Sequence, residues 1–449
     1  MAGLCSAARR RTRLQSRPVP RKGVGVAARP VLRGLVIDLS PLRSGRGFRI
    51  VFAVRLISLF GGGFRLVALP MQVYAMTGSS VLVASVTVVN GLASFGGTVL
   101  GGLLADRLDR RRLMLASLGV EALVVGVFAV NTYLPGGPLL AVVYVCAAVN
   151  GVIGTMGLIA QQSMVPALVG PHRLAAAGAL FALTAQLGAV TAPALGGALI
   201  SLGGVGAGYI ATCAIAAAAT AAVWFVPPTQ ADTSAAAVPA LRAVADGLAF
   251  VAGSPVVRPL LLLGFIQVLF TMPMVLIPEF TDRVLGGDAA LAGLLYTAPA
   301  AGALLASLTS GWTGSVGRAG AIVPAAVAMC GVSVVLLGAG RSAAAALGAL
   351  VLLGCCQAVE EILRYSLIQA HTPDALRGRV NSAWLAQAAA GGSLGATLMG
   401  ALAAVLGTAA ALMAAGAAGA VLAGAIALTA PGLLATRGVA PPLPDDLPD

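Results

Sequence analysis

The chain has 449 residues, of which 59% are hydrophobic and only 10% are charged. An ordinary soluble domain carries about 25% charged residues, so this composition excludes that class and predicts a polytopic membrane protein. The formal charge of +13 is typical of a nucleic-acid binder, but residues 1–49 hold twelve basic residues and one acidic residue and account for +11 of it. This basic arm favours retention on the cytoplasmic side and attraction to anionic lipid. No folded basic domain with interleaved aromatic residues is visible, so we expect no nucleic-acid partner.

Two tails and one linker are expected outside the membrane. Residues 1–46 are rich in Arg, Pro and Ala without sustained periodicity, which predicts a basic, disordered cytoplasmic tail, although an over-extended start codon would give the same pattern. Residues 434–449 form a second cytoplasmic tail, and residues 227–257 form a cytoplasmic linker. Four apolar residues of the linker share one face and predict an interfacial helix: Leu241, Val244, Leu248 and Val251.

Apolar segments follow one another closely from Phe48 onward, and each is long enough to cross a hydrocarbon core of about 30 Å as a helix. We place twelve helices at 48–75, 80–105, 113–133, 138–162, 174–202, 205–226, 258–281, 290–313, 319–340, 342–366, 379–406 and 409–432. With the N-terminus inside, eleven later arginines fall in cytoplasmic segments and only Arg283 and Arg341 in outer loops. This asymmetry predicts an all-α protein of the plasma membrane with both termini cytoplasmic.

The second half of the membrane region repeats features of the first. Gly188 and Gly197 in the first half match Gly391 and Gly400 in the second, and one common offset separates each glycine from its counterpart. The repetition predicts two six-helix halves, residues 47–226 and 258–433, arranged as parallel repeats.

The loop between the second and third predicted helices, GGLLADRLDRRR (Gly101–Arg112), carries an ordered set of charges. Its pattern Gly-x-x-x-Asp-Arg-x-x-Arg-Arg resembles the loop signature of the major facilitator superfamily, and the residues on that pattern are Gly102, Asp106, Arg107, Arg110 and Arg111. Asp109 stands where the pattern usually has glycine, which predicts a differently built turn. The resemblance implies that Asp106 meets the start of helix eleven, near Arg379, and latches the halves closed on the cytoplasmic side.

Beyond this loop, the whole membrane region resembles the enterobactin-exporter branch of the superfamily. The segments that carry the resemblance are FRIVFAVRLIS (Phe48–Ser58), VPALVG (Val165–Gly170), APALGG (Ala192–Gly197), SPVVRPLLLLG (Ser254–Gly264) and TPDALRGRVNSAWLAQ (Thr372–Gln387). The resemblance implies a secondary active exporter of a siderophore or similar amphipathic molecule, working as a proton antiporter by alternating access. Relatives with similar motifs export drugs, so multidrug efflux is the alternative.

The fifth predicted helix combines one proline with several glycines. Gly188, Pro193, Gly196 and Gly197 predict tight packing, and a proline within a membrane helix frees a carbonyl group that needs another partner. Two interpretations remain open for this group, a packing kink and a gating hinge.

Ionisable residues inside the membrane are costly and mark functional sites. At 1.5 Å per residue, Glu121 lies about 13 Å, Arg55 about 9 Å and Arg65 about 24 Å from the cytoplasmic ends of their helices. These three residues are the candidates for proton coupling, and two polar residues are expected to face the same cavity: Asn150 and Gln186.

Glu121 is our candidate for the proton carrier. Because their estimated depths agree within about 5 Å, we expect Arg55 to be its partner. A permanent Arg–Glu bridge that joins helices one and three is the structural alternative.

Other acidic residues are expected near the membrane surfaces. Glu360 lies about 27 Å from Ser342, so we expect it near the cytoplasmic face in a surface pair with Arg364. Glu279 and Arg283 lie at the outer end of helix seven, where interfacial anchoring explains them.

A membrane enzyme and a non-transporting receptor are the competing classes. An enzyme acting on lipids would need clustered acids for Mg²⁺ or a His-Glu zinc motif, and the sequence shows neither. The six cysteines have no metal-ligand spacing, and no P-loop is present, so we expect no cofactor and no metal. The expected partners are a small-molecule substrate, protons and membrane lipids. The sequence does not give the oligomeric state, and we expect a monomer.

Overall fold

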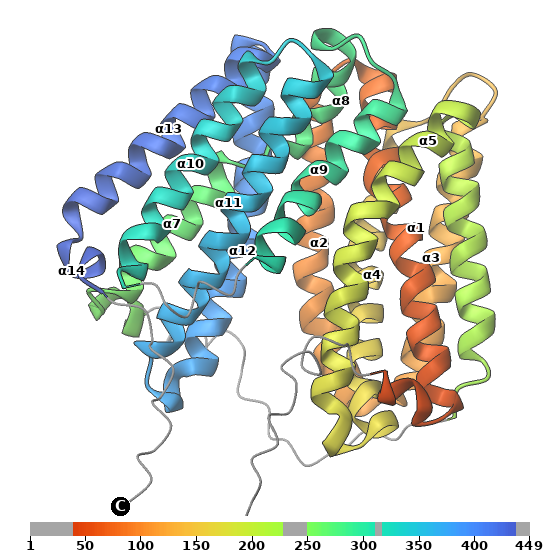
Figure 1. The fold of residues 1–449 in the computed structure, drawn as a ribbon. Coiled ribbons are helices and arrows are strands. Elements are labelled where there is room, and N and C mark those ends of the chain that lie inside the picture. The colour runs from red at the N-terminus through yellow and green to blue at the C-terminus, as the bar shows by residue number, and fades with distance from the viewer. Residues whose placement is uncertain (1–38, 228–248, 310–316, 437–449) are drawn as a thin grey trace, which may run out of the picture. The chain divides into compact units, whose positions relative to one another are not determined.

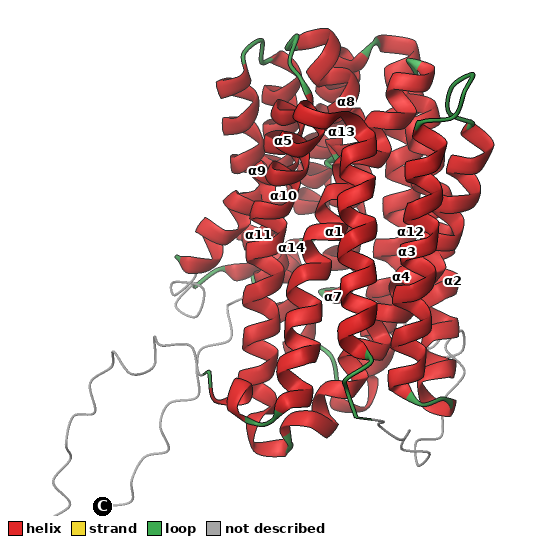
Figure 2. Ribbon diagram, turned by 90° about the vertical axis from the view of Figure 1, so that its right-hand side faces the viewer, coloured by secondary structure: helices red, strands yellow, loops and turns green. Residues whose placement is uncertain are grey.

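The computed structural model describes residues 39–227, 249–309 and 317–436. These residues belong to one compact unit, Leu39–Asp449. The described residues form helices and connecting turns and contain no strand (Figure 2).

The first group of helices covers the N-terminal half (Figure 1). It consists of α1 (Arg46–Thr77), α2 (Ser80–Arg107), α3 (Arg110–Thr132), α4 (Leu140–Val169) and α5 (Leu174–Val223). Short 3₁₀ turns, η2 (Ser40–Arg43) and η3 (Pro171–Arg173), precede α1 and α5. Residues 40–46 were expected to be disordered, but Pro41 is buried and Leu42 packs against a hydrophobic cluster, so this part of the tail is ordered.

The second group covers the C-terminal half. It consists of α7 (Val257–Phe270), η4 (Pro273–Leu276), α8 (Ile277–Glu279), the π-helical turn η5 (Phe280–Val284), α9 (Ala289–Leu308), α10 (Ala319–Ala339), α11 (Ala343–Ala370), α12 (Asp374–Leu406), α13 (Thr408–Thr429) and α14 (Pro431–Leu434). Of the expected linker helix, Leu241, Val244 and Leu248 lie outside the described residues, whereas Val251 packs in a hydrophobic cluster with α7.

Eleven helical segments among the described residues are long and apolar enough to span a membrane. One of them, the 50-residue α5, contains non-helical backbone at Gly204, where φ is 73°. Because glycine adopts positive φ without steric cost, the chain can turn here, and α5 divides into two spans, 174–203 and 205–223. Gly407, with φ of 79°, forms the corresponding turn between α12 and α13. The arrangement is consistent with twelve spans, and both turns lie where the sequence predicts them.

Helix seven was expected to run unbroken over 258–281, but α7 ends at Phe270. Pro273 follows the break, and proline disfavours a helical conformation in the residue before it. The carbonyl groups freed at the break have partners, because Gln357 Nε2 donates to Thr271 O at 3.4 Å and Tyr296 Oη donates to Met274 O at 2.9 Å. The break therefore leaves these two carbonyls satisfied within the membrane.

The two halves meet through small residues on two pairs of helices, α5 with α9 and α2 with α12. A Cβ atom on Gly197 would lie 2.7 Å from Gly293 Cα, and one on Gly400 would lie 2.8 Å from Ala84 Cβ. Close approach of this kind is how membrane helices gain packing energy.

The hydrophobic core is shared between the halves at one end only. The largest cluster of buried residues contains side chains from both halves, among them Phe128, Tyr209, Leu276 and Met399. At the other end, the described buried residues separate into one cluster around Met114 and Met164 and another around Leu260 and Leu367. The halves are thus joined at the end that contains Gly78 and Gly204 and are less connected at the opposite end.

Candidate functional site: a charged cavity in the N-terminal half

A cavity of about 330 Å³ lies among α1, α2, α3 and α4. Four of the five predicted cavity residues line it: Arg55, Arg65, Glu121 and Asn150. Serine, asparagine and glutamine side chains provide most of its remaining polar lining, namely Ser58, Asn90, Ser94, Ser117 and Gln161. Its charged lining residues are two arginines and one glutamate, so the lining carries a net charge of +1.

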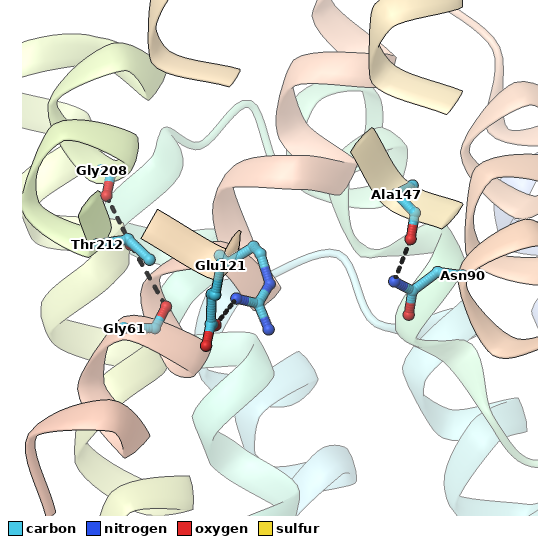
Figure 3. Close-up of polar contacts among 7 residues, drawn as sticks. Gly61, Asn90, Glu121, Ala147, Gly208 and Thr212 are labelled. Carbon is cyan, nitrogen blue, oxygen red and sulfur yellow. Dashed lines mark hydrogen bonds and ion pairs between the residues drawn. The ribbon is translucent and has the colours of Figure 1, made fainter. Parts of the chain in front are cut away.

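Three consecutive glycines of α1 make the space for this cavity. Gly61 packs against Thr212, whose hydroxyl donates to Gly61 O at 3.3 Å (Figure 3). Gly63 packs against Ala192. Gly62 lines the cavity, and a Cβ there would meet no atom within 4 Å. One turn of α1 therefore packs tightly on α5 with one face and leaves room for side chains on the other.

Glu121 forms an ion pair with Arg65. Arg65 Nη1 donates to Glu121 Oε1 at 2.7 Å, and the two side chains are 20% and 19% exposed (Figure 3). A charge-assisted contact of this length within a membrane protein joins α1 to α3 across the cavity.

The prediction that Arg55 would be the partner of Glu121 is wrong. Counted from the helix starts, Arg65 lies about 28 Å along α1 and Glu121 about 16 Å along α3. The contact shows that the two helices do not start at the same level. In addition, the long arginine side chain leans toward the N-terminus of its helix and covers part of the difference.

Arg55 instead contacts residues that carry no charge. Its Nη1 donates to Gln161 Oε1 at 3.3 Å, and its guanidinium lies over the Phe181 ring, 4.6 Å from the centroid. The buried Nε atom has no hydrogen-bond partner among the described residues. Arg55 thus remains a cation without an acidic partner in the part of the chain that the structure describes.

The two predicted polar residues differ in position. Asn150 is 4% exposed, and its side-chain nitrogen has no partner among the described residues. Nearby on the facing helix, Asn90 Nδ2 donates to Ala147 O at 2.9 Å and ties α2 to α4 (Figure 3). Gln186 is half-buried on α5 and does not line this cavity.

The charged loop forms the end of α2 and the start of α3. Asp109 caps α3, because its Oδ1 accepts from Arg112 N at 2.9 Å. This cap is the different turn expected where the superfamily pattern has glycine. Arg110 Nη1 donates to Ser163 O at 2.9 Å, and Arg111 contacts the Trp224 carbonyl and ring.

The remaining motif residues lie at the end of α2. The backbone of Asp106 and Arg107 is helical, but their side chains lie outside the described part, so the latch of Asp106 stays a prediction. A Cβ at Gly102 would meet no atom within 4 Å, whereas one at Gly101 would lie 3.0 Å from Met156 Cα. The close approach to α4 is therefore at Gly101 and not at the motif glycine.

The residues of the predicted α5 hinge pack on two different helices. Gly188 and Gly196 face α1, where Leu59 and Phe64 lie against them. Gly197 faces α9 in the other half, and the Pro193 carbonyl lies against Gly293. Gly204 is the non-helical residue of α5, so the helix continues through Pro193. The contacts support tight packing, and hinge motion at these residues stays a prediction.

A buried ion pair in the C-terminal half was placed wrongly by sequence reasoning. Glu360 is 0% exposed and Arg364 is 4% exposed, and Arg364 Nε lies 2.6 Å from Glu360 Oε1. This contact does not have hydrogen-bond geometry, so it is an ion pair. Arg364 also lies over the Trp384 ring of α12, 4.6 Å from the centroid, and against Gly264 of α7.

The error in depth comes from the end of the helix. Because α11 continues to Ala370, Glu360 lies about 15 Å from the C-terminal end of that helix, and Glu121 lies about 16 Å from the start of α3. The surface pair expected here is therefore buried between α11, α7 and α12. The apolar run to Ala370, before Pro373, was the signal that could have placed it.

A polar contact between the halves at the joined end was also missed. Ser80 of α2 donates to Glu279, which is 6% exposed and also contacts Arg283 at 3.1 Å. Arg283 Nη2 in turn donates to Gly78 O at 3.4 Å. These residues join the turn after α1 to the C-terminal part of the seventh span, so they do more than anchor a helix end.

Comparisons with known proteins agree with this architecture. Residues 37–437 match the family described as transmembrane secretion effector. The chain is 33% identical over 379 residues to the enterobactin exporter EntS of Shigella boydii serotype 4 (strain Sb227), which covers 83% of this chain and 88% of that exporter. The EntS protein of Escherichia coli O139:H28 (strain E24377A / ETEC) has the same identity and coverage.

Solved transporter structures share the fold at low sequence identity. The nucleoside transporter NupG has a TM-score of 0.68 at 13% identity and covers 86% of this chain and 98% of its own. A bacterial homologue of the iron transporter ferroportin, in an inward-facing state, has a TM-score of 0.65 at 16% identity. This match covers 85% of the present chain and 98% of the homologue. At this level of identity the likeness shows the major facilitator fold alone.

Proposed function

Since the chain belongs to the transmembrane secretion effector family of the major facilitator superfamily, we propose that it exports a siderophore or a similar amphipathic molecule. The match to enterobactin exporters over 83% of the chain supports both the cargo class and the outward direction. The distribution of arginines supports a location in the plasma membrane with both termini in the cytoplasm.

The observation that carries the proposed mechanism is the Arg65–Glu121 ion pair inside a membrane cavity. A carboxylate in this position can take up a proton when the cavity opens to the more acidic side, and protonation releases Arg65 from its ion pair. Loss of the proton on the other side restores the pair. Export by antiport with protons follows if these two states favour different arrangements of the halves.

Alternating access needs contacts that close each side of the membrane in turn. In the proposed orientation, the contacts at Gly197–Gly293 and Ser80–Glu279 close the outer side. The shared hydrophobic cluster lies at that same side, and the clusters of the inner side are separate. We assign this conformation to an inward-open state, and the Asp106 latch to the opposite state.

Deleting the gene tests the cargo. Under iron starvation, the deletion strain should release less siderophore into the medium and accumulate more of it in the cell. Complementation with the wild-type gene should restore both values. Unchanged siderophore together with new sensitivity to dyes or antibiotics would favour multidrug efflux instead.

A further inference from the structure

Arg55 is a charged residue that the coupling mechanism does not use. It lies nine residues after the start of α1, about 14 Å along that helix. Its partners among the described residues, the Gln161 amide and the Phe181 ring, are uncharged. Neutral groups compensate a half-buried cation less well than an anion does, so this guanidinium retains unsatisfied affinity for negative charge.

The cavity has two chemically different ends. Arg65 and Glu121 neutralise each other at one end. Arg55 lies ten residues earlier on α1, about 15 Å away along the helix axis, at the end where Gln161 lies. The net charge of +1 on the lining therefore resides at the Arg55 end, and it does not depend on the ion pair.

We propose that Arg55 binds an acidic group of the exported molecule, a carboxylate or a phenolate. The proposal rests on the export function and assigns one part of its cavity. A guanidinium offers up to five N–H donors in a planar fork that suits such an anion. Gln161 Oε1 accepts a hydrogen bond from the guanidinium and the Phe181 ring lies against it, so both side chains hold Arg55 in place at the cavity.

The size of the cavity limits what enters it. About 330 Å³ is at the lower end of the ~300–1,000 Å³ typical of small-molecule sites. The cavity in this conformation therefore accepts a small acid or one acidic group of a larger cargo, whose remainder extends toward the space between the halves.

The test uses benzoate as the anionic probe and benzamide as its neutral counterpart. Binding of both is measured by isothermal titration calorimetry on the full-length protein in lipid nanodiscs. Wild type should bind benzoate about tenfold or more tightly than benzamide, the factor expected for a charge-assisted hydrogen bond. Arg55→Gln should weaken benzoate to the level of benzamide, and Arg55→Lys should retain a preference for benzoate.

Arg341→Gln is the matched control, because Arg341 is exposed in the turn between α10 and α11, and it should bind benzoate like wild type. Thermal unfolding shows whether each variant is folded. If Arg55→Gln unfolds, the comparison of wild type with Arg55→Lys tests the proposal instead. Both proteins should then bind benzoate more tightly than benzamide.

Three results would overturn the assignment: no saturable benzoate binding by wild type, equal binding of benzoate and benzamide, or undiminished benzoate binding by folded Arg55→Gln. The outcome is separable from the cargo test. A chain that exports another acid would fail the siderophore experiment and keep the benzoate result. A siderophore exporter with no acid site at Arg55 would pass the siderophore experiment and show no benzoate preference.

Discussion

Replacing Gly197 by alanine should open the contact between the halves at the joined end without touching the cavity. The added methyl group would lie 2.7 Å from Gly293 Cα, where ordinary contacts begin at 3.4 Å, so α5 and α9 must separate by at least 0.7 Å. The three nearest atoms, Ala289 O and the Cα and N atoms of Gly293, all belong to the backbone and cannot rotate away. Overpacking of this kind costs about 1–3 kcal/mol. Since about 1.4 kcal/mol corresponds to a tenfold change in an equilibrium constant, the equilibrium moves away from the conformation with the joined end closed by about 5- to 150-fold.

The shift can be measured by double electron–electron resonance between spin labels at Leu202 and Arg341, in a background without other cysteines. Both positions are exposed and lie at the joined end. Gly197→Ala should increase the fraction of long distances, and Gly293→Ala should do the same. Gly178→Ala is the matched control on α5, because its Cβ would meet no atom within 4 Å. An unchanged distance distribution in a folded Gly197→Ala protein would refute the reasoning.

The remaining predictions concern coupling, stability and topology. Glu121→Gln keeps the shape but cannot cycle a proton, so it should abolish pH-driven export in proteoliposomes while substrate binding survives; normal pH dependence would rule out Glu121 as the carrier. Arg364→Gln leaves the Glu360 carboxylate buried and unpaired and should lower the free energy of unfolding by about 3–5 kcal/mol in detergent; unchanged stability would show that the pair contributes little. Asp106→Asn should cut transport while expression is maintained, and wild-type export rates would argue against a latch. A reporter fused after Arg437 should give a cytoplasmic signal, and an external signal would contradict the twelve-span topology.

Sequence reasoning located the spans because their signal is local. A run of apolar residues predicts a span whatever its neighbours are, and the glycine turns at Gly204 and Gly407 interrupt two long runs in corresponding places. The family resemblance was readable for the same reason, since its motifs are short segments of adjacent residues. The break after Phe270 was also local, and Pro273 could have revealed it.

The pairing of side chains from different helices could not be read in this way. Counting residues gives a depth along one helix but not the level at which the next helix starts, so Arg65 was passed over as the partner of Glu121. Glu279 was assigned to a helix end because the sequence does not show that Ser80, 199 residues earlier, faces it from the other half. Burial of the Glu360–Arg364 pair likewise depends on α7 and α12, which contact Arg364 from other parts of the chain.

The break in the seventh span has a mechanical consequence. A continuous helix transmits rotation from one membrane face to the other, because each backbone hydrogen bond fixes the next turn. Between Phe270 and Pro273 that ladder is interrupted, and α7 packs on α12, α13 and α10 while α8 packs on α9. A binder raised against the exposed residues Asp282 and Arg283 of η5 would therefore act on the contact with α2 without having to turn α7.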